Sequence, residues 1–441
     1  MRTRLWKANF IVFISSTCTL VIELVAGRIM APYVGVSLYT WTSIIGVVLA
    51  GISLGNFVGG RLADRRASPA VLGILFFAGG LATLGILIAT AWVTAAPMPT
   101  GFSLVTKIVV FTTVIFFLPC FILGMVSPVV VKLTLKDLGE AGNVVGMIYA
   151  FGAAGSILGT FLTGFLLISS LGTRSIIWLV ALVLIVMGLV FGEFWKIWQR
   201  QRASLAGLMI LAYGLPFMMA REQFKAPCIV ESDYYCINVF DTKIDNGTPV
   251  RALVLDHLIH SYSSLEDPKI LGYGYERIYE EVTQYVSQSK TGLRALFIGG
   301  GGYTYPRYLE AVYPDSTVDV VEIDPSVTSV AYQWLGLAPD TRIHTVNEDA
   351  RLFFNGTPHE KYDFAFGDAF NDLSVPYHLT TREFDALVKG QLKDDGIYMV
   401  NIIDKYQGGQ FIGAFLKTVK EVFPYVYLMG PGPVWDYSGA S

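Results

Sequence analysis

The chain has 441 residues, of which 53% are hydrophobic and only 15% are charged, and its formal net charge is −3 at pH 7. The charge is divided unevenly, because residues 8–220 hold 16 charged side chains and residues 221–441 hold 48. A soluble domain averages about a quarter charged residues, which excludes the first half as a soluble domain. The second half holds 18 basic and 30 acidic residues, and this acidity disfavours nucleic acid as a partner.

The first half is predicted to be a multi-pass helical membrane domain. Seven apolar runs are long enough to cross a hydrocarbon core of about 30 Å; they cover residues 8–27, 37–60, 70–92, 105–131, 144–168, 173–192 and 203–220. The first run lacks a small-residue cleavage site, so we expect no cleavable signal peptide. Glycines recur at helical spacing in two runs, which favours close helix packing in lipid; they are Gly51, Gly55, Gly59 and Gly60, and Gly152, Gly155, Gly159 and Gly164.

Lysine and arginine in the short loops predict the orientation. The N-terminus and the loops after the second, fourth and sixth runs are basic, which predicts a cytoplasmic N-terminus in the cell (inner) membrane. With seven spans, the second half then starts outside the cytoplasm. Cys228 and Cys236 flank its first strand, and an oxidising compartment favours a disulfide between them, with buried free thiols as the alternative. The cofactor chemistry described below favours the cytoplasm instead, so the side of the membrane stays open.

The second half begins with a small β-stranded region. Two strand-like runs, Cys236–Phe240 and Val250–Leu255, are separated by Asp245-Asn246-Gly247, which is typical of a hairpin turn. A helical pattern follows at Tyr275–Val286. We therefore expect three parts: a transmembrane domain at 1–222, the β-stranded region with its connecting helix at 223–290, and a nucleoside-binding domain at 291–441.

Strands and helices then alternate along the chain. The predicted strands are Leu296–Ile298, Val318–Ile323, Ile343–Asn347, Phe364–Phe366 and Ile397–Ile403, and the predicted helices include Ser326–Leu335 and Phe384–Leu392. This alternation predicts an α/β Rossmann-like domain with a parallel, doubly wound sheet, in which ligands bind at the carboxyl ends of the strands.

A glycine-rich turn is the first candidate binding element. The first strand ends in Gly299, Gly300, Gly301 and Gly302, and the second strand ends in Glu322, about 20 residues further on. Glycines allow a ligand to approach the backbone, and a carboxylate at this spacing can hold ribose hydroxyls. The pattern predicts an adenosine-type ligand. A tight turn without a ligand and a solvated Glu322 are the alternatives.

Two further acidic positions follow strand ends. Asp349-Ala350 is expected to contact adenine, to cap the next helix, or to do both. Asp368 follows the buried run Phe364–Phe366, and a carboxylate there can hold an amine or accept its proton. A loop cap is the alternative for Asp368.

These residues resemble the spermidine synthase (polyamine aminopropyltransferase) family over residues 229–405. The resemblance implies a nucleoside site at Gly299, Gly300, Gly301, Glu322, Asp349 and Ala350, a catalytic Asp368, and substrate contacts from His260, Tyr275, Glu276, Asn371 and Asp372. It also implies decarboxylated S-adenosylmethionine as the aminopropyl donor and putrescine as the acceptor. No metal is expected.

The chain departs from the family pattern at three places. Gly302 stands where the family carries an aspartate that helps to hold the aminopropyl amine, and His260 stands at a glutamine position. Asn371 replaces the second aspartate of an Asp-x-x-Asp motif, with Asp372 one residue late. The nucleoside half of the site therefore follows the family more closely than the amine half does.

The loop Gly60–Arg66 is similar to a loop signature of major facilitator transporters, and the whole chain resembles membrane-fused spermidine synthase-like proteins. Three functional hypotheses follow: a membrane-anchored aminopropyltransferase of polyamine biosynthesis, an S-adenosylmethionine-dependent methyltransferase-like enzyme, and a transporter or sensor that binds a nucleoside or polyamine without turnover. The expected partners are a small-molecule amine or polyamine and the lipid bilayer, and a homodimer is left open.

Overall fold

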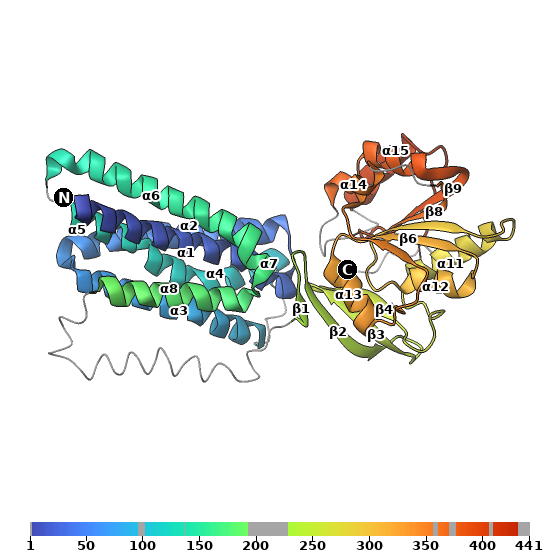
Figure 1. Ribbon diagram of the computed structural model, residues 1–441, viewed down its shortest axis with the longest axis horizontal. Coiled ribbons are helices and arrows are strands. Elements are labelled where there is room, and N and C mark those ends of the chain that lie inside the picture. The colour runs from blue at the N-terminus through green and yellow to red at the C-terminus, as the bar shows by residue number, and fades with distance from the viewer. Residues whose placement is uncertain are drawn as a thin grey trace. The chain divides into compact units, whose positions relative to one another are not determined.

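The protein divides into two compact units, Met1–Pro227 and Cys228–Ser441. The structure, a computed structural model, describes residues 2–95, 102–135, 137–192, 228–355, 360–369, 376–404 and 409–430 (Figure 1). Three predictions lie outside these residues: the seventh apolar run at 203–220, and the substrate contacts Asn371 and Asp372.

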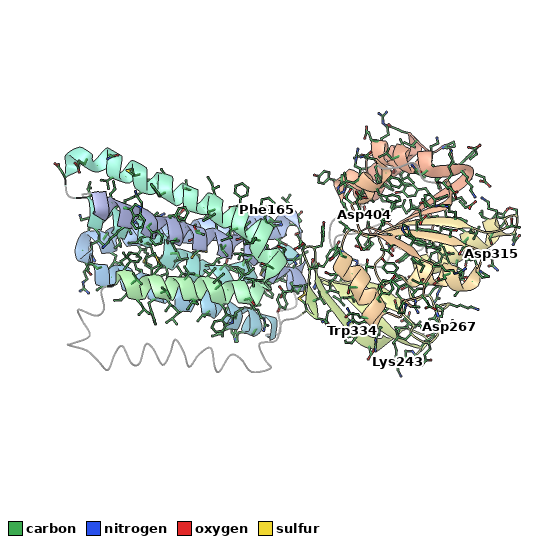
Figure 2. The ribbon with its side chains drawn as sticks, in the orientation of Figure 1. Phe165, Lys243, Asp267, Asp315, Trp334 and Asp404 are labelled. Carbon is green, nitrogen blue, oxygen red and sulfur yellow. A yellow bond between two sulfur atoms is a disulfide. The ribbon has the colours of Figure 1, made fainter. Side chains whose placement is uncertain are left out.

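The first unit is helical. Its helices are α1 (Arg2–Val34), α2 (Leu38–Arg66), α3 (Pro69–Ala95), α4 (Leu104–Gly124), α5 (Val126–Thr134), α6 (Ala141–Leu162), α7 (Ile168–Ser170) and α8 (Thr173–Phe191), with a 3₁₀ turn at Leu138–Glu140 and a π turn at Thr163–Leu167. Some of these helices follow one another without a break and form longer helical segments. In the described part of the chain, six helical segments are long and apolar enough to cross a membrane. They coincide with the first six predicted runs. Apolar side chains such as Phe165, 77% exposed, cover the surface of this unit (Figure 2), as expected for contact with lipid.

Glycines allow the helices of this unit to approach closely. A Cβ atom on Gly55 would lie 2.2 Å from the carbonyl oxygen of Phe121 in α4, and one on Gly155 would lie 2.2 Å from that of Phe13 in α1. The hydroxyl of Thr17 in α1 donates to the carbonyl oxygen of Gly155 at 3.0 Å. The packing role predicted for the glycines is confirmed at these crossings, whereas Gly60 and Gly164 have nothing within 4 Å of such a Cβ.

The second unit begins with a small antiparallel sheet. Its strands β1 (Val230–Glu231), β2 (Cys236–Lys243), β3 (Pro249–Leu255) and β4 (Leu258–Ser263) pair in sequence order. The predicted turn joins β2 to β3, and Gly247 has a φ of 83°, which glycine adopts without strain. A disulfide between Cys228 and Cys236 fastens the start of this sheet.

A five-stranded parallel sheet follows, in the order β7-β6-β5-β8-β9. Its strands are β5 (Arg294–Ile298), β6 (Thr317–Val321), β7 (His344–Val346), β8 (Tyr362–Gly367) and β9 (Leu392–Val400). The doubly wound prediction is confirmed, and the strand order reverses between β5 and β8. In such sheets the crevice at this reversal binds ligands. β9 ends earlier than predicted, so that Asn401 lies beyond its carboxyl end.

Helices cover both faces of the parallel sheet. They are α11 (Gly274–Ser287), α12 (Thr304–Val312), α13 (Pro325–Trp334), α14 (Ala350–Phe354), α15 (Arg382–Gln391) and α16 (Phe411–Lys420), with a 3₁₀ turn at Tyr377–Leu379. Successive side chains of β5 point to opposite layers, because Phe297 packs with Tyr279 and Tyr305 whereas Ile298 packs with Phe353. Figure 1 shows α14 and α15 on one side of this sheet and α11 and α12 on the other.

The small sheet packs on the end of α13. Arg251 of β3 donates to the carbonyl oxygen of Trp334 at 2.8 Å, and its guanidinium lies 5.9 Å from the Trp334 ring centroid. Figure 2 labels Trp334 beside these strands. At its other contact, Ser263 Oγ of β4 donates to the carbonyl oxygen of Gly302 at 3.2 Å, which holds the small sheet next to the turn that follows β5.

Candidate active site

The glycine-rich turn lies at the strand reversal. Gly299 and Gly301 have φ values of 99° and 47°, in the left-handed region that favours glycine. A Cβ atom on Gly299 would lie 2.5 Å from the backbone oxygen of Asp368, so the turn and the end of β8 touch. Tyr303 adopts φ 56° at the end of the turn, and its buried hydroxyl bonds with that of Thr328 at 3.0 Å. The turn is therefore fixed in shape before any ligand arrives.

Glu322 connects this turn to the end of β6. Its Oε2 accepts from the amides of Gly300 at 2.7 Å and Gly301 at 3.3 Å, and its Oε1 accepts from the amide of Asp324 at 2.9 Å. Burial raises the pKa of Glu322, and these amide hydrogen bonds oppose the rise. A carboxylate has about four acceptor positions, so Glu322 retains acceptor capacity for a ribose hydroxyl beside the glycines.

Asp368 lies at the carboxyl end of β8, held between two neutral donors. Its Oδ2 accepts from the Tyr275 hydroxyl at 2.7 Å and its Oδ1 accepts from the Asn401 side-chain amide at 3.0 Å. Burial raises the pKa of Asp368, and the hydrogen bonds from Asn401 and Tyr275 lower it in part. Among the described residues no cation forms an ion pair with Asp368. The carboxyl is thus oriented by neutral groups and is free to meet a ligand cation or a proton.

Tyr275 and Glu276 begin α11 but have different surroundings. Tyr275 contacts Asp368 directly. Glu276 is 2% exposed, and its Oε2 accepts from the Tyr273 amide at 3.0 Å, which caps the helix. Burial raises the pKa of Glu276 to about 8. Tyr275 therefore contacts the Asp368 carboxyl, whereas Glu276 caps α11.

Asp349 caps α14. Its Oδ1 accepts from the amides of Arg351 at 2.9 Å and Leu352 at 3.3 Å, and its Oδ2 lies 2.8 Å from Nε2 of His378. The capping alternative is therefore the arrangement observed, and Ala350 is buried beneath it. The cap does not test the other alternative, so an adenine contact by Asp349 remains a proposal.

His260 and Ser261 lie in β4 of the small sheet, and Ser261 contacts the end of the glycine turn. The pairing of β3 with β4 shifts register here, with Leu253 opposite Ser261 and Val254 opposite Ile259, so His260 is the extra residue of a bulge. Burial lowers the pKa of His260 to about 4, and this side chain is therefore neutral at pH 7. Within the described residues, His260 Nε2 and Ser261 Oγ are buried without a hydrogen-bond partner.

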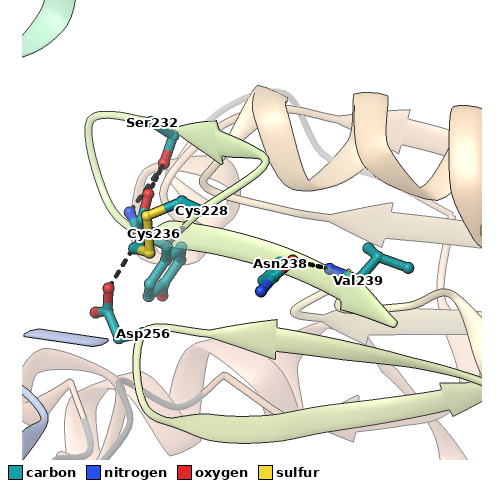
Figure 3. Close-up of a disulfide and its surroundings, with 7 residues drawn as sticks. Cys228, Ser232, Cys236, Asn238, Val239 and Asp256 are labelled. Carbon is teal, nitrogen blue, oxygen red and sulfur yellow. Dashed lines mark hydrogen bonds between the residues drawn. A yellow bond between two sulfur atoms is a disulfide. The ribbon is translucent and has the colours of Figure 1, made fainter. Parts of the chain in front are cut away.

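Sequence reasoning misses two contributors to the site. Asn401 falls inside the predicted strand Ile397–Ile403, although a polar residue after an apolar run is the usual signal for a strand end. Ser232 carries no motif; its hydroxyl donates to the carboxylate of Asp324, two residues after Glu322. Figure 3 shows the disulfide Cys228–Cys236 beside Ser232, whose hydroxyl also accepts from the Tyr235 amide at 2.8 Å. The disulfide therefore holds the segment that supports the end of β6.

The predicted residues fall into two groups. Gly299, Gly300, Gly301, Glu322, Asp368 and Tyr275 come together at the strand reversal, whereas Asp349 and Glu276 cap helices and His260 lies in the β4 bulge. No group of three or more His, Cys, Asp or Glu able to hold a metal ion occurs in the part of the chain that the structure describes. The convergent group consists of a glycine turn, a buried carboxyl (Glu322) that accepts from the amides of that turn, and a second carboxyl (Asp368) oriented by Tyr275 and Asn401.

Comparisons with known proteins relate the second unit to one domain family. Residues 276–430 match the spermine/spermidine synthase domain family. A polyamine aminopropyltransferase of Vibrio vulnificus is 40% identical over 128 residues, covering 26% of this chain and 42% of that protein. Polyamine aminopropyltransferase 2 of Ralstonia nicotianae is 23% identical over 473 residues, covering 97% of this chain and 85% of that protein.

A solved structure of a probable spermidine synthase from Corynebacterium glutamicum is 25% identical, with a TM-score of 0.39, and covers 43% of this chain and 68% of that chain. The chain spans less than half of the length of the first curated relatives that it matches. The second unit has a Rossmann-like α/β fold with a doubly wound parallel sheet. More specifically, residues 276–430 are similar to spermine/spermidine synthase domains, and six long apolar helices precede them in the described part of the chain.

Proposed function

We propose that the chain is a membrane-anchored aminopropyltransferase that transfers an aminopropyl group from decarboxylated S-adenosylmethionine to an amine such as putrescine. One observation carries the proposal: Asp368, oriented by Tyr275 and Asn401, touches the glycine turn that Glu322 supports. Asp368, the carboxyl proposed to react, follows β8. Glu322, the carboxyl proposed to bind ribose, follows β6, on the other side of β5.

The proposed reaction is a displacement at carbon. The acceptor amine nitrogen attacks the methylene carbon bound to the donor sulfonium, the carbon–sulfur bond breaks, and methylthioadenosine leaves with the electron pair. Asp368 accepts the proton that the nitrogen loses. A carboxyl with a raised pKa is suited to this role, because a general base works best when its pKa lies near the operating pH.

The test uses the full chain in detergent with decarboxylated S-adenosylmethionine and putrescine. Stoichiometric formation of methylthioadenosine and an aminopropylated amine is expected. A methylated acceptor formed from S-adenosylmethionine would instead support the methyltransferase-like alternative, which the absence of a side chain at Gly302 favours. Binding of adenosine compounds without any product would support a transporter or sensor and overturn both enzymatic proposals.

We also propose that the second unit lies outside the cytoplasm. The Cys228–Cys236 disulfide supports this side, because such bonds persist in oxidising compartments. The basic loops and the apolar run at 203–220 support it as well. Alkaline phosphatase fused after Ser441 should be active, and the same fusion after Gly192 should be inactive. Equal inactivity of both fusions would place the second unit in the cytoplasm.

A further inference from the structure

Glu23 is an acidic residue deep within the first apolar segment. At 1.5 Å per residue, about 16 Å of helix separate it from Val34 and about 27 Å separate it from Leu5. The other acidic residue of the six apolar segments in the described part of the chain is Asp64, near the end of α2, which is 74% exposed and pairs with Lys132 at 2.9 Å. Glu23 forms no ion pair or hydrogen bond with a described residue. Since a charged carboxylate is costly in hydrocarbon, Glu23 needs a proton or a cation that the described residues do not supply.

The Glu23 carboxyl is directed at the helix α4. Its charge acts on the thiol of Cys120, a fully buried residue of α4. At the same level α2 packs on α4, because a Cβ atom on Gly51 would lie 3.1 Å from the Cβ atom of Cys120. The carboxyl therefore points toward the interior of the helical bundle rather than into lipid.

A tryptophan ring lies one helical turn from Glu23. Residues four apart on an α-helix share a face, with Cβ atoms about 5–6 Å apart, so Gly27 follows Glu23 on the same face of α1. A Cβ atom on Gly27 would lie 2.9 Å from Cζ2 and 3.0 Å from Cη2 of Trp41 in α2. The missing side chain lets the indole lie against α1, within reach of a ligand that pairs with Glu23. Because Gly27 lies between Glu23 and Val34, the ring borders the shorter way from the end of α1 to the carboxyl.

A carboxylate beside an indole ring favours an ammonium ion over a metal ion. Indole rings attract ammonium cations, most strongly among the aromatic side chains. Divalent metal ions instead take several oxygen ligands, and the described residues around Glu23 include no group of three or more His, Cys, Asp or Glu that could hold one.

We infer that Glu23 and Trp41 form a binding site for an alkylammonium ion in the first unit. The Glu23 carboxylate pairs with the ammonium group, and the Trp41 ring contacts the charge and the methylene groups next to it. Because both residues belong to the apolar helices, this site goes beyond the transfer reaction proposed for the second unit.

The first measurement uses dicyclohexylcarbodiimide, which modifies protonated carboxyl groups in apolar surroundings. The full chain in detergent is treated with this reagent, with and without putrescine, and the α1 peptide is measured by mass spectrometry. We expect modification of Glu23 that saturating putrescine slows by about tenfold, because an ammonium-paired carboxylate is deprotonated and shielded. Sodium chloride at the same ionic strength should slow it by less than about twofold. The inference is overturned by modification that putrescine leaves unchanged, which would mean a proton-binding carboxyl only. Equal slowing by salt, or a Glu23 that never reacts, would also overturn it.

Substitutions of Trp41 test the aromatic contact. At the same putrescine concentration, Trp41→Leu should keep the modification of Glu23 but reduce the protection to about twofold, whereas Trp41→Phe should retain most of it. Trp92→Leu is the matched control, because Trp92 in α3 is 67% exposed, and this variant should keep the protection of the wild type. Glu23→Gln should remove the modified α1 peptide, which assigns the reacting carboxyl. Full protection in Trp41→Leu would overturn the inference.

Discussion

The two ends of the parallel sheet use carboxylates in opposite ways. At the amino end, Asp363 of β8 is 1% exposed and accepts from Lys290 at 2.7 Å and Lys393 at 2.8 Å. At the carboxyl end of the same strand, the donors to Asp368 within the described residues are neutral, Tyr275 and Asn401. Near the start of β8, Asp363 is thus neutralised by two lysines and stabilises the fold. At its end, Asp368 has no cationic partner among the described residues.

The strand β6, which is separated from β8 by β5, repeats this difference. Asp319 of β6 bonds with Arg294 at 3.3 Å and with the Tyr362 hydroxyl at 2.9 Å, whereas Glu322, beyond the end of β6, accepts from backbone amides. Burial works to raise the pKa of Asp363, but hydrogen bonds from Lys290 and Lys393 outweigh it and the pKa lies below its ordinary value. Burial leaves the pKa of Asp368 raised. In the described parts of β6 and β8, the carboxyls nearer the amino ends thus have a cationic partner, whereas Glu322 and Asp368 accept from neutral donors.

The largest effect is expected from removing the charge of Asp368. Asp368→Asn keeps the size of the side chain and removes the base, so turnover should fall by about 10³-fold while nucleoside affinity changes little. Product formation and calorimetric titration with methylthioadenosine measure the two quantities. Unchanged turnover would remove Asp368 from the mechanism, and an equal loss of binding would make its role structural.

At the opposite end, Asp363→Ala should destabilise the sheet rather than affect chemistry. Removing Asp363 leaves Lys290 and the Arg294 amide without their buried acceptor, and the local opening free energy of β8 should fall by about 3 kcal/mol. Hydrogen exchange of residues 362–367 in the full chain measures this change.

Asp395→Ala is the matched control, because Asp395 also pairs with Lys290, at 2.9 Å, but is 69% exposed. Its loss should cost under about 0.5 kcal/mol. Equal effects of the two substitutions would contradict a special role for the buried carboxylate at the amino end.

A smaller effect at the carboxyl end is expected from reducing the disulfide. The Cys228–Cys236 bond fastens the segment from which Ser232 donates to Asp324, next to Glu322. Reduction loosens that support, so nucleoside affinity should fall by about threefold, whereas exchange at the amino end of β8 should stay unchanged. The double variant Cys228→Ser, Cys236→Ser should reproduce the loss without a reductant. Unaltered affinity in both would separate the disulfide from the site.

The smallest effect is the acid dependence of the fold. Since the folded-state pKa of Asp363 is depressed, its stabilisation is present above the unfolded pKa of about 3.9 and is lost as the pH falls through the lower folded value. Hydrogen exchange protection of β8 is measured through this acid range and corrected for the intrinsic exchange rate. As the pH decreases, this protection should fall less steeply in Asp363→Asn than in wild type. Parallel slopes would show that Asp363 has the same pKa in both states.

The sequence by itself determined the class of fold and the approximate ends of β5, β6 and β8, but not those of β9. Charge density separated the apolar helices from the second unit, and alternation of apolar runs placed β5, β6 and β8 within one or two residues. Because the residue that follows a strand is set by local sequence, the pattern alone placed Glu322 and Asp368 at the same sheet edge as the glycines. Tyr275 was predicted as a site residue only from the resemblance to the spermidine synthase family.

Only the tertiary structure decided which groups these carboxyls meet. Tyr275 reaches Asp368 across 93 residues and Asn401 across 33, and no local pattern encodes such contacts. The same holds for Ser261 and Ser263, which close position 302 from another sheet. The sequence showed that Gly302 lacks a side chain; the packing of β4 on the turn supplies the reason, because two atoms cannot occupy the same space.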